Sequence, residues 1–127
     1  YGVDDIPLIL RDAVLDQGRL VYPQHPMARM HGVRGATMLA NGVVDPVTRV
    51  PRAWVRLRLV NASNARVFDL AFDDGREFLW IGTDGGLLGT PQGRRSLVLA
   101  PAQRAELLVD FTAGEGVALM TSPDPMV

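Results

Sequence analysis

Two residue types that carry much of protein chemistry are absent from this sequence of 127 residues. It contains no cysteine, and each of its 13 Lys+Arg positions is an arginine, so lysine is absent too. Without cysteine the chain cannot form disulfides, thiolate zinc sites, a cysteine nucleophile or a cysteine-ligated copper centre. Without lysine it cannot form a Schiff base or hold a nucleotide phosphate in the manner of a P-loop.

Other features are scarce. Aromatic residues make up 6% of the chain and the net charge is −1, which predicts neither a base-stacking surface nor a basic face for nucleic acid. No apolar run approaches the roughly 20 residues of a membrane-spanning helix. The first residues, YGVDDIPLIL, lack the basic region of a signal peptide. Because the sequence begins without methionine and directly in a strand-like run, we expect it to be an excised piece of a longer protein.

What the chain does contain is a series of short segments in which apolar and polar residues alternate, as is typical of β-strands. The clearest is WVRLRLVNA, where Val55, Leu57 and Leu59 share one face. The segment 77–84 is more continuously apolar, which indicates an interior strand buried on both faces. Strands are expected at 5–15, 18–22, 37–44, 54–62, 66–72, 77–84, 95–101, 104–111 and 116–122.

The segments between these strands carry turn signals. Asp73–Arg76 contains Asp-Gly, which favours a hairpin turn. The stretch GGLLGTPQG at 85–93 has four glycines and a proline and is expected to be a loop. No stretch of 12 residues shows helical periodicity with caps. Eight or nine strands in one domain, residues 1–127, predict an all-β fold, a Greek-key β-sandwich.

No catalytic or cofactor-binding residue is predicted. No serine lies in a motif that marks an activated nucleophile. The adjacent carboxylates Asp4–Asp5 and Asp73–Asp74 point apart on a strand or turn, unlike a catalytic acid–base pair. The glycine-rich stretch lacks the Gly-Lys-Ser/Thr ending of a phosphate loop.

One segment, HPMARMHG, holds both histidines and two of the five methionines. Imidazole and thioether together suit Cu(I), so His25, Met27, Met30 and His31 are weak candidates for a metal site. The alternative is a proline-punctuated loop whose methionines fill gaps against a neighbouring surface. The chain has no H-x-H pair, which would place two imidazoles on one side of a strand.

Five stretches, in order, resemble the second cupredoxin domain of the multicopper oxidases, most closely of bacterial laccases and cuprous oxidases. They cover the chain from Asp4 to about Pro123 and read DDIPLILRD, ANG, WVRLRLVNASNAR, DGGLL and LAPAQRAELLVDF. One departure is Ala36, where relatives often have aspartate.

This resemblance implies a cupredoxin-like sandwich, the middle one of three in series. Copper ligands lie in the first and third domains of such enzymes, as H-x-H motifs and an H-C-H run, and the middle domain generally carries no copper. The absence of cysteine and of H-x-H agrees with that implication. The methionine-rich insert of cuprous oxidases belongs to their third domain, so HPMARMH does not match it. By analogy we expect Arg66 and Arg104 to form structural ion pairs, with Asp84 and Glu106 as partners.

The sequence therefore predicts a copper-free bridging domain, inactive alone, with flanking cupredoxin domains as its partners. Its parent would couple one-electron oxidation of phenols or metal ions to reduction of O2 to water, in the periplasm or outside the cell. Two alternatives stay open. One is a copper-binding module that uses the His25–His31 segment, and the other is a domain of a copper-less structural relative.

Overall fold

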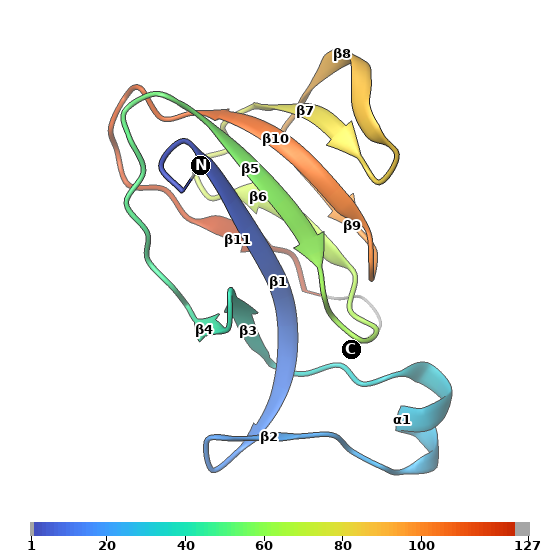
Figure 1. Ribbon diagram of the computed structural model, residues 1–127. Coiled ribbons are helices and arrows are strands. Elements are labelled where there is room, and N and C mark those ends of the chain that lie inside the picture. The colour runs from blue at the N-terminus through green and yellow to red at the C-terminus, as the bar shows by residue number, and fades with distance from the viewer. Residues whose placement is uncertain (1, 124–127) are drawn as a thin grey trace.

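The computed structural model describes residues 2–123, in which eleven strands and one short helix follow one another (Figure 1). These elements are β1 (Asp5–Asp16), β2 (Arg19–Val21), α1 (Pro26–His31), β3 (Thr37–Ala40), β4 (Val43–Val44), β5 (Trp54–Asn61), β6 (Phe68–Phe72), β7 (Phe78–Thr83), β8 (Gly86–Arg94), β9 (Ser96–Leu99), β10 (Arg104–Asp110) and β11 (Leu119–Thr121).

The strands form two sheets that pack face to face. The larger sheet has the order β4-β3-β1-β5-β10-β7-β8, with β2 paired to β1, and the smaller has the order β11-β6-β9. β1 and β5 run parallel, whereas the other strand pairs of the described residues run antiparallel. From β5 onward the chain passes repeatedly from one sheet to the other, and only β7 and β8 are consecutive in one sheet. This confirms the predicted all-β, cupredoxin-like sandwich.

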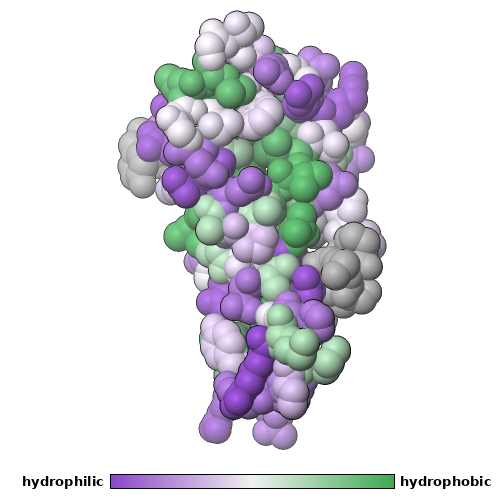
Figure 2. All heavy atoms as spheres, turned by 90° about the vertical axis from the view of Figure 1, so that its right-hand side faces the viewer, coloured by the Kyte–Doolittle hydropathy of each residue, from purple (hydrophilic) through white to green (hydrophobic). Residues whose placement is uncertain are grey.

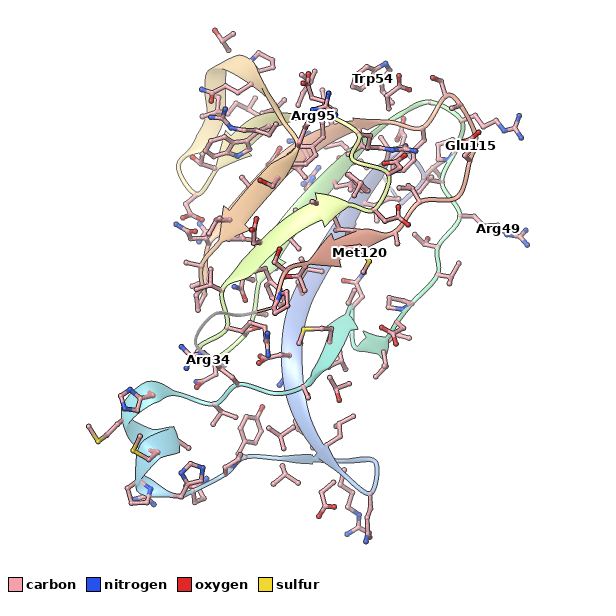
Figure 3. The ribbon with its side chains drawn as sticks, turned by 180° about the vertical axis from the view of Figure 1, so that it is seen from behind. Arg34, Arg49, Trp54, Arg95, Glu115 and Met120 are labelled. Atoms are coloured by element: carbon pink, nitrogen blue, oxygen red, sulfur yellow. The ribbon has the colours of Figure 1, made fainter. Side chains whose placement is uncertain are left out.

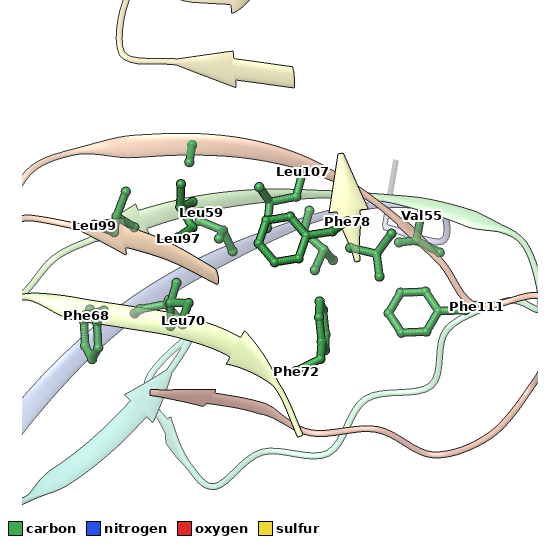
Figure 4. Packing of buried hydrophobic residues seen from close by; sticks show 14 residues of the cluster. Val55, Leu59, Phe68, Leu70, Phe72, Phe78, Leu97, Leu99, Leu107 and Phe111 are labelled. Carbon is green, nitrogen blue, oxygen red and sulfur yellow. The ribbon is translucent and has the colours of Figure 1, made fainter. Parts of the chain in front are cut away.

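The apolar core lies between the two sheets (Figure 4). On β5 the predicted face is buried, since Val55, Leu57 and Leu59 are at most 5% exposed. β6 contributes Phe68, Leu70 and Phe72, and β10 contributes Ala105, Leu107 and Val109. Period-2 alternation places these side chains inward, because successive residues of a strand point to opposite faces.

One end of the core is closed by aromatic rings and an arginine. The ring of Phe72 meets those of Phe78 and Phe111 edge-on, with centroids 6.1 and 6.2 Å apart. The guanidinium of Arg76 lies 5.3 Å from the Phe111 centroid, and its Nη2 donates to the Asp74 carboxylate at 2.7 Å. This hydrogen bond holds the pKa of the Asp74 carboxyl below its usual range.

Two sequence predictions about glycine-rich segments were wrong. Residues 85–93 were expected to be a loop but form most of β8, which pairs with β7 at the edge of the larger sheet. Most β8 side chains are exposed, so backbone pairing builds this strand without an alternating pattern. The Asp73–Arg76 turn is present, with Gly75 at φ 70°, but it connects β6 and β7 in different sheets and is no hairpin.

Two other strand predictions need refinement. The expected single strand 37–44 is a hairpin of β3 and β4, because Asn41 and Gly42 take φ of 50° and 79° and turn the chain. β7 is an interior strand as expected, but only Phe78 and Gly82 of it are fully buried.

The segment from the end of β1 to α1 leaves the sandwich and projects beyond it (Figure 1). β2 pairs with the last residues of β1, from Val14 to Asp16, and α1 follows after a short connection. We call residues 14–34 the arm. Its helix has six residues, and nowhere in residues 2–123 is there a helix long and apolar enough to cross a membrane.

Replacing a core leucine tests the packing. The Leu107 side chain is 0% exposed, so Leu107→Ala creates a cavity in the core. It should lower the free energy of unfolding by about 2–5 kcal/mol. The matched control is Leu87→Ala on β8, where the side chain is 71% exposed and the loss should stay within about 0.5 kcal/mol. Urea denaturation followed by circular dichroism measures both. Equal losses would contradict the assigned core.

Candidate functional site

The candidate metal ligands lie on the arm, where the predicted loop is instead the short helix α1. His25 is its N-cap residue, in extended backbone conformation, and Pro26 follows at the first helical turn. Proline is favoured there because its missing N–H would have no helical partner. A cap from histidine was not anticipated, since Ser, Thr, Asp and Asn are the usual N-cap residues.

The cap determines what His25 can do chemically. Its Nδ1 accepts a hydrogen bond from the backbone N–H of Ala28 at 3.2 Å. A neutral imidazole has one acceptor nitrogen and one N–H, so a neutral His25 that accepts this bond on Nδ1 carries its proton on Nε2. Neither nitrogen then offers a free lone pair to a metal. The structure therefore separates His25 from the other three candidates.

Met27, Met30 and His31 are brought together on α1. Met27 is 59% exposed, Met30 is 76% exposed, and His31 is exposed as well. The helix buries only Ala28 against the rest of the molecule. Among residues 2–123 no group of three or more His, Cys, Asp or Glu side chains could hold a metal ion. The described residues therefore fit neither a cysteine-ligated copper centre nor a cluster of histidines.

A buried ion pair fixes the place where the arm rejoins the sandwich. The Asp12 carboxylate accepts hydrogen bonds from Arg66 Nε at 3.2 Å and from the backbone N–H of Gly35 at 2.6 Å. Arg66 Nη2 also donates to the carbonyl of Gly35 at 2.6 Å. The side chains of Asp12 and Arg66 are 3% and 7% exposed. We call Asp12, Arg66 and Gly35 the anchor.

The turn between β5 and β6 completes this region. Asn64 Oδ1 accepts from the backbone N–H of Val33 at 2.6 Å, and Ser63 Oγ accepts from that of Asp12 at 3.1 Å. Asn61 is 0% exposed and donates to the carbonyls of Arg66 and Leu99, both at 2.8 Å. Buried polar groups are stable only when they are paired in this way.

Glycines at the anchor allow close approach of the backbone. A Cβ on Gly35 would collide with the backbone of Ala13, and one on Gly32 would come within 2.6 Å of the Ala65 Cβ. Gly32 also has φ of 78°, which other residues rarely adopt. The chain can therefore pass from α1 back to the sandwich only with glycine at these two positions.

A hollow of about 360 Å³ lies where the arm meets the sandwich. At its rim Arg11 Nη2 donates to the Tyr22 hydroxyl at 3.0 Å. The hollow is lined by backbone and side chains of Arg11, Val14, Leu20, Tyr22, Val33 and Asn64. Its polar groups are largely paired with one another, so it offers no reactive centre.

The expected ion pairs are confirmed in part. Arg104 Nη1 lies 3.3 Å from Asp84 Oδ1, as predicted. Glu106 pairs with Arg56, however, and Arg66 pairs with Asp12, so the expected assignment of those two partners was wrong.

The outer face of β1, β5 and β10 carries a ladder of charges. Arg58 Nε donates to Asp5 Oδ1 at 2.8 Å, and this hydrogen bond lowers the pKa of the Asp5 carboxyl. Arg56 on β5 pairs with Glu106 on β10. These partly exposed pairs tie three adjacent strands together across the sheet, although each contributes little by itself.

Sequence analysis missed Asp12, the residue on which the anchor depends. Its signal is a lone carboxylate between the apolar runs of β1, in PLILRDAVL. Such a residue is rarely buried without a partner. Its partner Arg66 is 54 positions away, and nothing in the sequence pairs the two.

Removing the anchor carboxylate should destabilise the chain strongly. Asp12→Ala leaves the buried guanidinium of Arg66 without a counter-charge and should lower the free energy of unfolding by about 3–5 kcal/mol. The control Arg104→Ala breaks an exposed ion pair and should cost at most about 1 kcal/mol. Urea denaturation measures both, and hydrogen exchange of the Val33 and Gly35 amides reports release of the arm. A loss below 1 kcal/mol for Asp12→Ala would contradict the anchor.

Known proteins resemble the chain along almost its whole length. No family model matches it. It is 49% identical over 119 residues to the cell division protein FtsP of Xenorhabdus nematophila and 48% identical to that of Edwardsiella tarda. Each of these matches covers 94% of this chain but 25% of the relative. The chain thus spans about a quarter of the length of the curated relatives it matches.

Solved structures agree with this relationship. The laccase-like multicopper oxidase CueO of Ochrobactrum sp. superposes with a TM-score of 0.94 at 45% identity, over 98% of this chain and 28% of that one. McoA, a multicopper oxidase of Aquifex aeolicus, superposes with a TM-score of 0.88 at 38% identity, over 99% of this chain and 28% of that one. The sandwich, its strand order and these matches together show a cupredoxin-like domain of the kind found in multicopper oxidases.

Proposed function

We propose that this chain is the bridging middle domain of a three-domain protein, and that it contributes no ligand to that protein's blue or trinuclear copper centre. One observation carries the proposal: nearly all of the chain matches just over a quarter of a multicopper oxidase, yet it contains neither cysteine nor an H-x-H pair. A unit that is structurally complete but lacks these ligands is suited to hold the domains that have them.

The construction of the domain supports this role. Its core is closed on both sides by sheets, and its outer charge ladder links β1, β5 and β10. The anchor fixes the projecting arm to the sandwich through buried hydrogen bonds. Rigidity of this kind matters for a spacer, because displacing reacting groups by about 1 Å can cost on the order of a hundredfold in rate.

The activity belongs to the parent protein in this proposal. Copper in the flanking domains would take electrons singly from a phenol or a metal ion and pass four of them to O2, with four protons, to give two water molecules. A periplasmic or extracellular location of the parent is part of this proposal, and the family resemblance supports it. This chain's own part is to set the spacing and orientation of its neighbours.

The curated relatives favour a second candidate, in which the parent is not an oxidase. Several relatives with 44–49% identity are named cell division proteins. In such a parent the same three sandwiches would serve as a binding framework without redox chemistry. The bridging role of this domain is common to both candidates, and only the flanking domains distinguish them.

Metal analysis of the parent separates the candidates. An oxidase parent, reconstituted with copper, should hold about four copper ions per chain, show the blue absorption of a copper–thiolate bond and consume O2 with a phenolic dye. A framework parent should do none of these. The 127-residue chain alone should oxidise the dye no faster than free copper does. Enzyme-like turnover by the isolated chain would contradict the bridging proposal for either parent.

A further inference from the structure

The arm carries three soft donor groups that the bridging role does not use. Figure 3 shows sulfur-bearing side chains and imidazole rings on the α1 ribbon, away from the sandwich. We propose that α1 is a surface binding site for a soft monovalent cation, Cu(I), built from the thioethers of Met27 and Met30 and the imidazole of His31. The proposal goes beyond the bridging function, because this site is separate from any catalytic copper centre of the parent.

The spacing of the three residues places their side chains together. Met30 and His31 follow Met27 by three and four positions on a helix. Residues at these separations lie on the same face with Cβ atoms about 5–6 Å apart. Methionine is unbranched and flexible, so two thioethers and one imidazole can converge on an ion above that face. Thioether and imidazole donors together select Cu(I) over harder cations.

The exposure of the methionines needs an explanation that packing does not give. Methionine is among the residues most often buried in folded proteins. Here Met27 and Met30 are 59% and 76% exposed, and neither belongs to the core or packs against it. Their sulfur atoms are accessible to solvent and to ions, although they add little to the stability of the sandwich.

The two histidines differ in a way that identifies the ligand. The lone pair of His25 is engaged by the Ala28 N–H, so His25 is part of the helix framework. The His31 imidazole makes no hydrogen bond to other residues in the range 2–123 that the structure describes, and it lies on the exposed last turn. His31 can therefore present a nitrogen lone pair without breaking the helix cap.

The charges on α1 disfavour a divalent ion more than a monovalent one. The first turn has no acidic residue, and the last turn carries Arg29 besides His31. Arg34 reaches back to the His31 carbonyl, with Nη1 at 3.3 Å from the oxygen. A divalent cation would meet this positive charge without a carboxylate to offset it, whereas neutral thioethers hold Cu(I) by polarisability.

Contacts next to the anchor hold the chain where it leaves α1. Directly after α1, Gly32 packs against Ala65, and the Val33 N–H is held by Asn64. Figure 2 shows strongly apolar atoms gathered on the upper body of the molecule, whereas the lower end on this side is mostly polar.

Methionine oxidation mapped by mass spectrometry tests the site residue by residue. Peroxide converts exposed thioethers to sulfoxides, and a thioether bound to metal is protected. Ag(I) serves as the probe, since it resembles Cu(I) in charge and softness and does not react with peroxide as Cu(I) does. With one equivalent of Ag(I), oxidation of Met27 and Met30 should slow at least about tenfold. Met120 on β11, 52% exposed and remote from α1, is the internal control and should oxidise unchanged.

A Cu(I) titration against a competing chelator tests the ligand set. Wild-type chain should bind one Cu(I) with a dissociation constant of about 1 μM or tighter. The variants Met27→Leu, Met30→Leu and His31→Gln should each weaken binding at least about tenfold. The matched control His25→Asn keeps an N-cap acceptor and removes the imidazole, so binding should be unchanged.

Several outcomes overturn the proposal. Equal protection of Met120, or none of Met27 and Met30, would show that Ag(I) does not bind α1. Loss of binding in His25→Asn would make His25 a ligand and the assigned set wrong. Because the oxidation map reads single methionines, it also applies to the longer parent protein. If Met27 and Met30 resist peroxide there without metal, a flanking domain covers them and α1 is a docking face. None of these results bears on the bridging role, which the metal content of the parent tests.

Discussion

The buried contact between Asp12 and Arg66 is the constraint on which the non-sandwich part of the molecule depends. The core of the two sheets forms from apolar alternation alone, but the arm buries little apolar surface of its own. Its return to the sandwich is held by polar bonds: a carboxylate, a guanidinium and the backbone of Gly35. A buried ion pair is expensive to desolvate, so its contribution is to fix one geometry more than to add stability.

The sandwich and the arm therefore obey different physical rules. In the sandwich, burial of alternating side chains sets both register and face, and many substitutions of similar volume would be tolerated. Where the arm rejoins the sandwich, buried polar groups have specific partners, such as the Asp12 carboxylate for the Gly35 N–H, and loss of one partner leaves the other unpaired. A protein that must present an exposed helix at a fixed angle needs this second kind of contact.

The sequence predicted the strands whose apolar and polar side chains alternate. It did not predict the features that depend on pairing between strands distant in the sequence. β5 was predicted with the correct inward face, and β6 and β10 were predicted as strands, because their side chains alternate. β8 was missed because its pairing uses backbone groups and leaves its side chains in solvent. The turn at Asp73–Arg76 was located correctly, but whether a turn makes a hairpin or a crossing between sheets depends on the partner strand, which local sequence does not specify.

The same limit applies to the candidate site. Sequence placed His25, Met27, Met30 and His31 in one segment as a group of equal candidates. Their division into one cap and three exposed donors followed only when the backbone of α1 was known. The capping bond removes His25 from metal chemistry and, by starting the helix, sets the other three at helical spacing. One hydrogen bond therefore occupies the lone pair of one candidate and sets the other three at helical spacing. The anchor then holds the end of this segment against the sandwich. The proposed site is compatible with the proposed bridging role, because none of its three donors is used in packing the core.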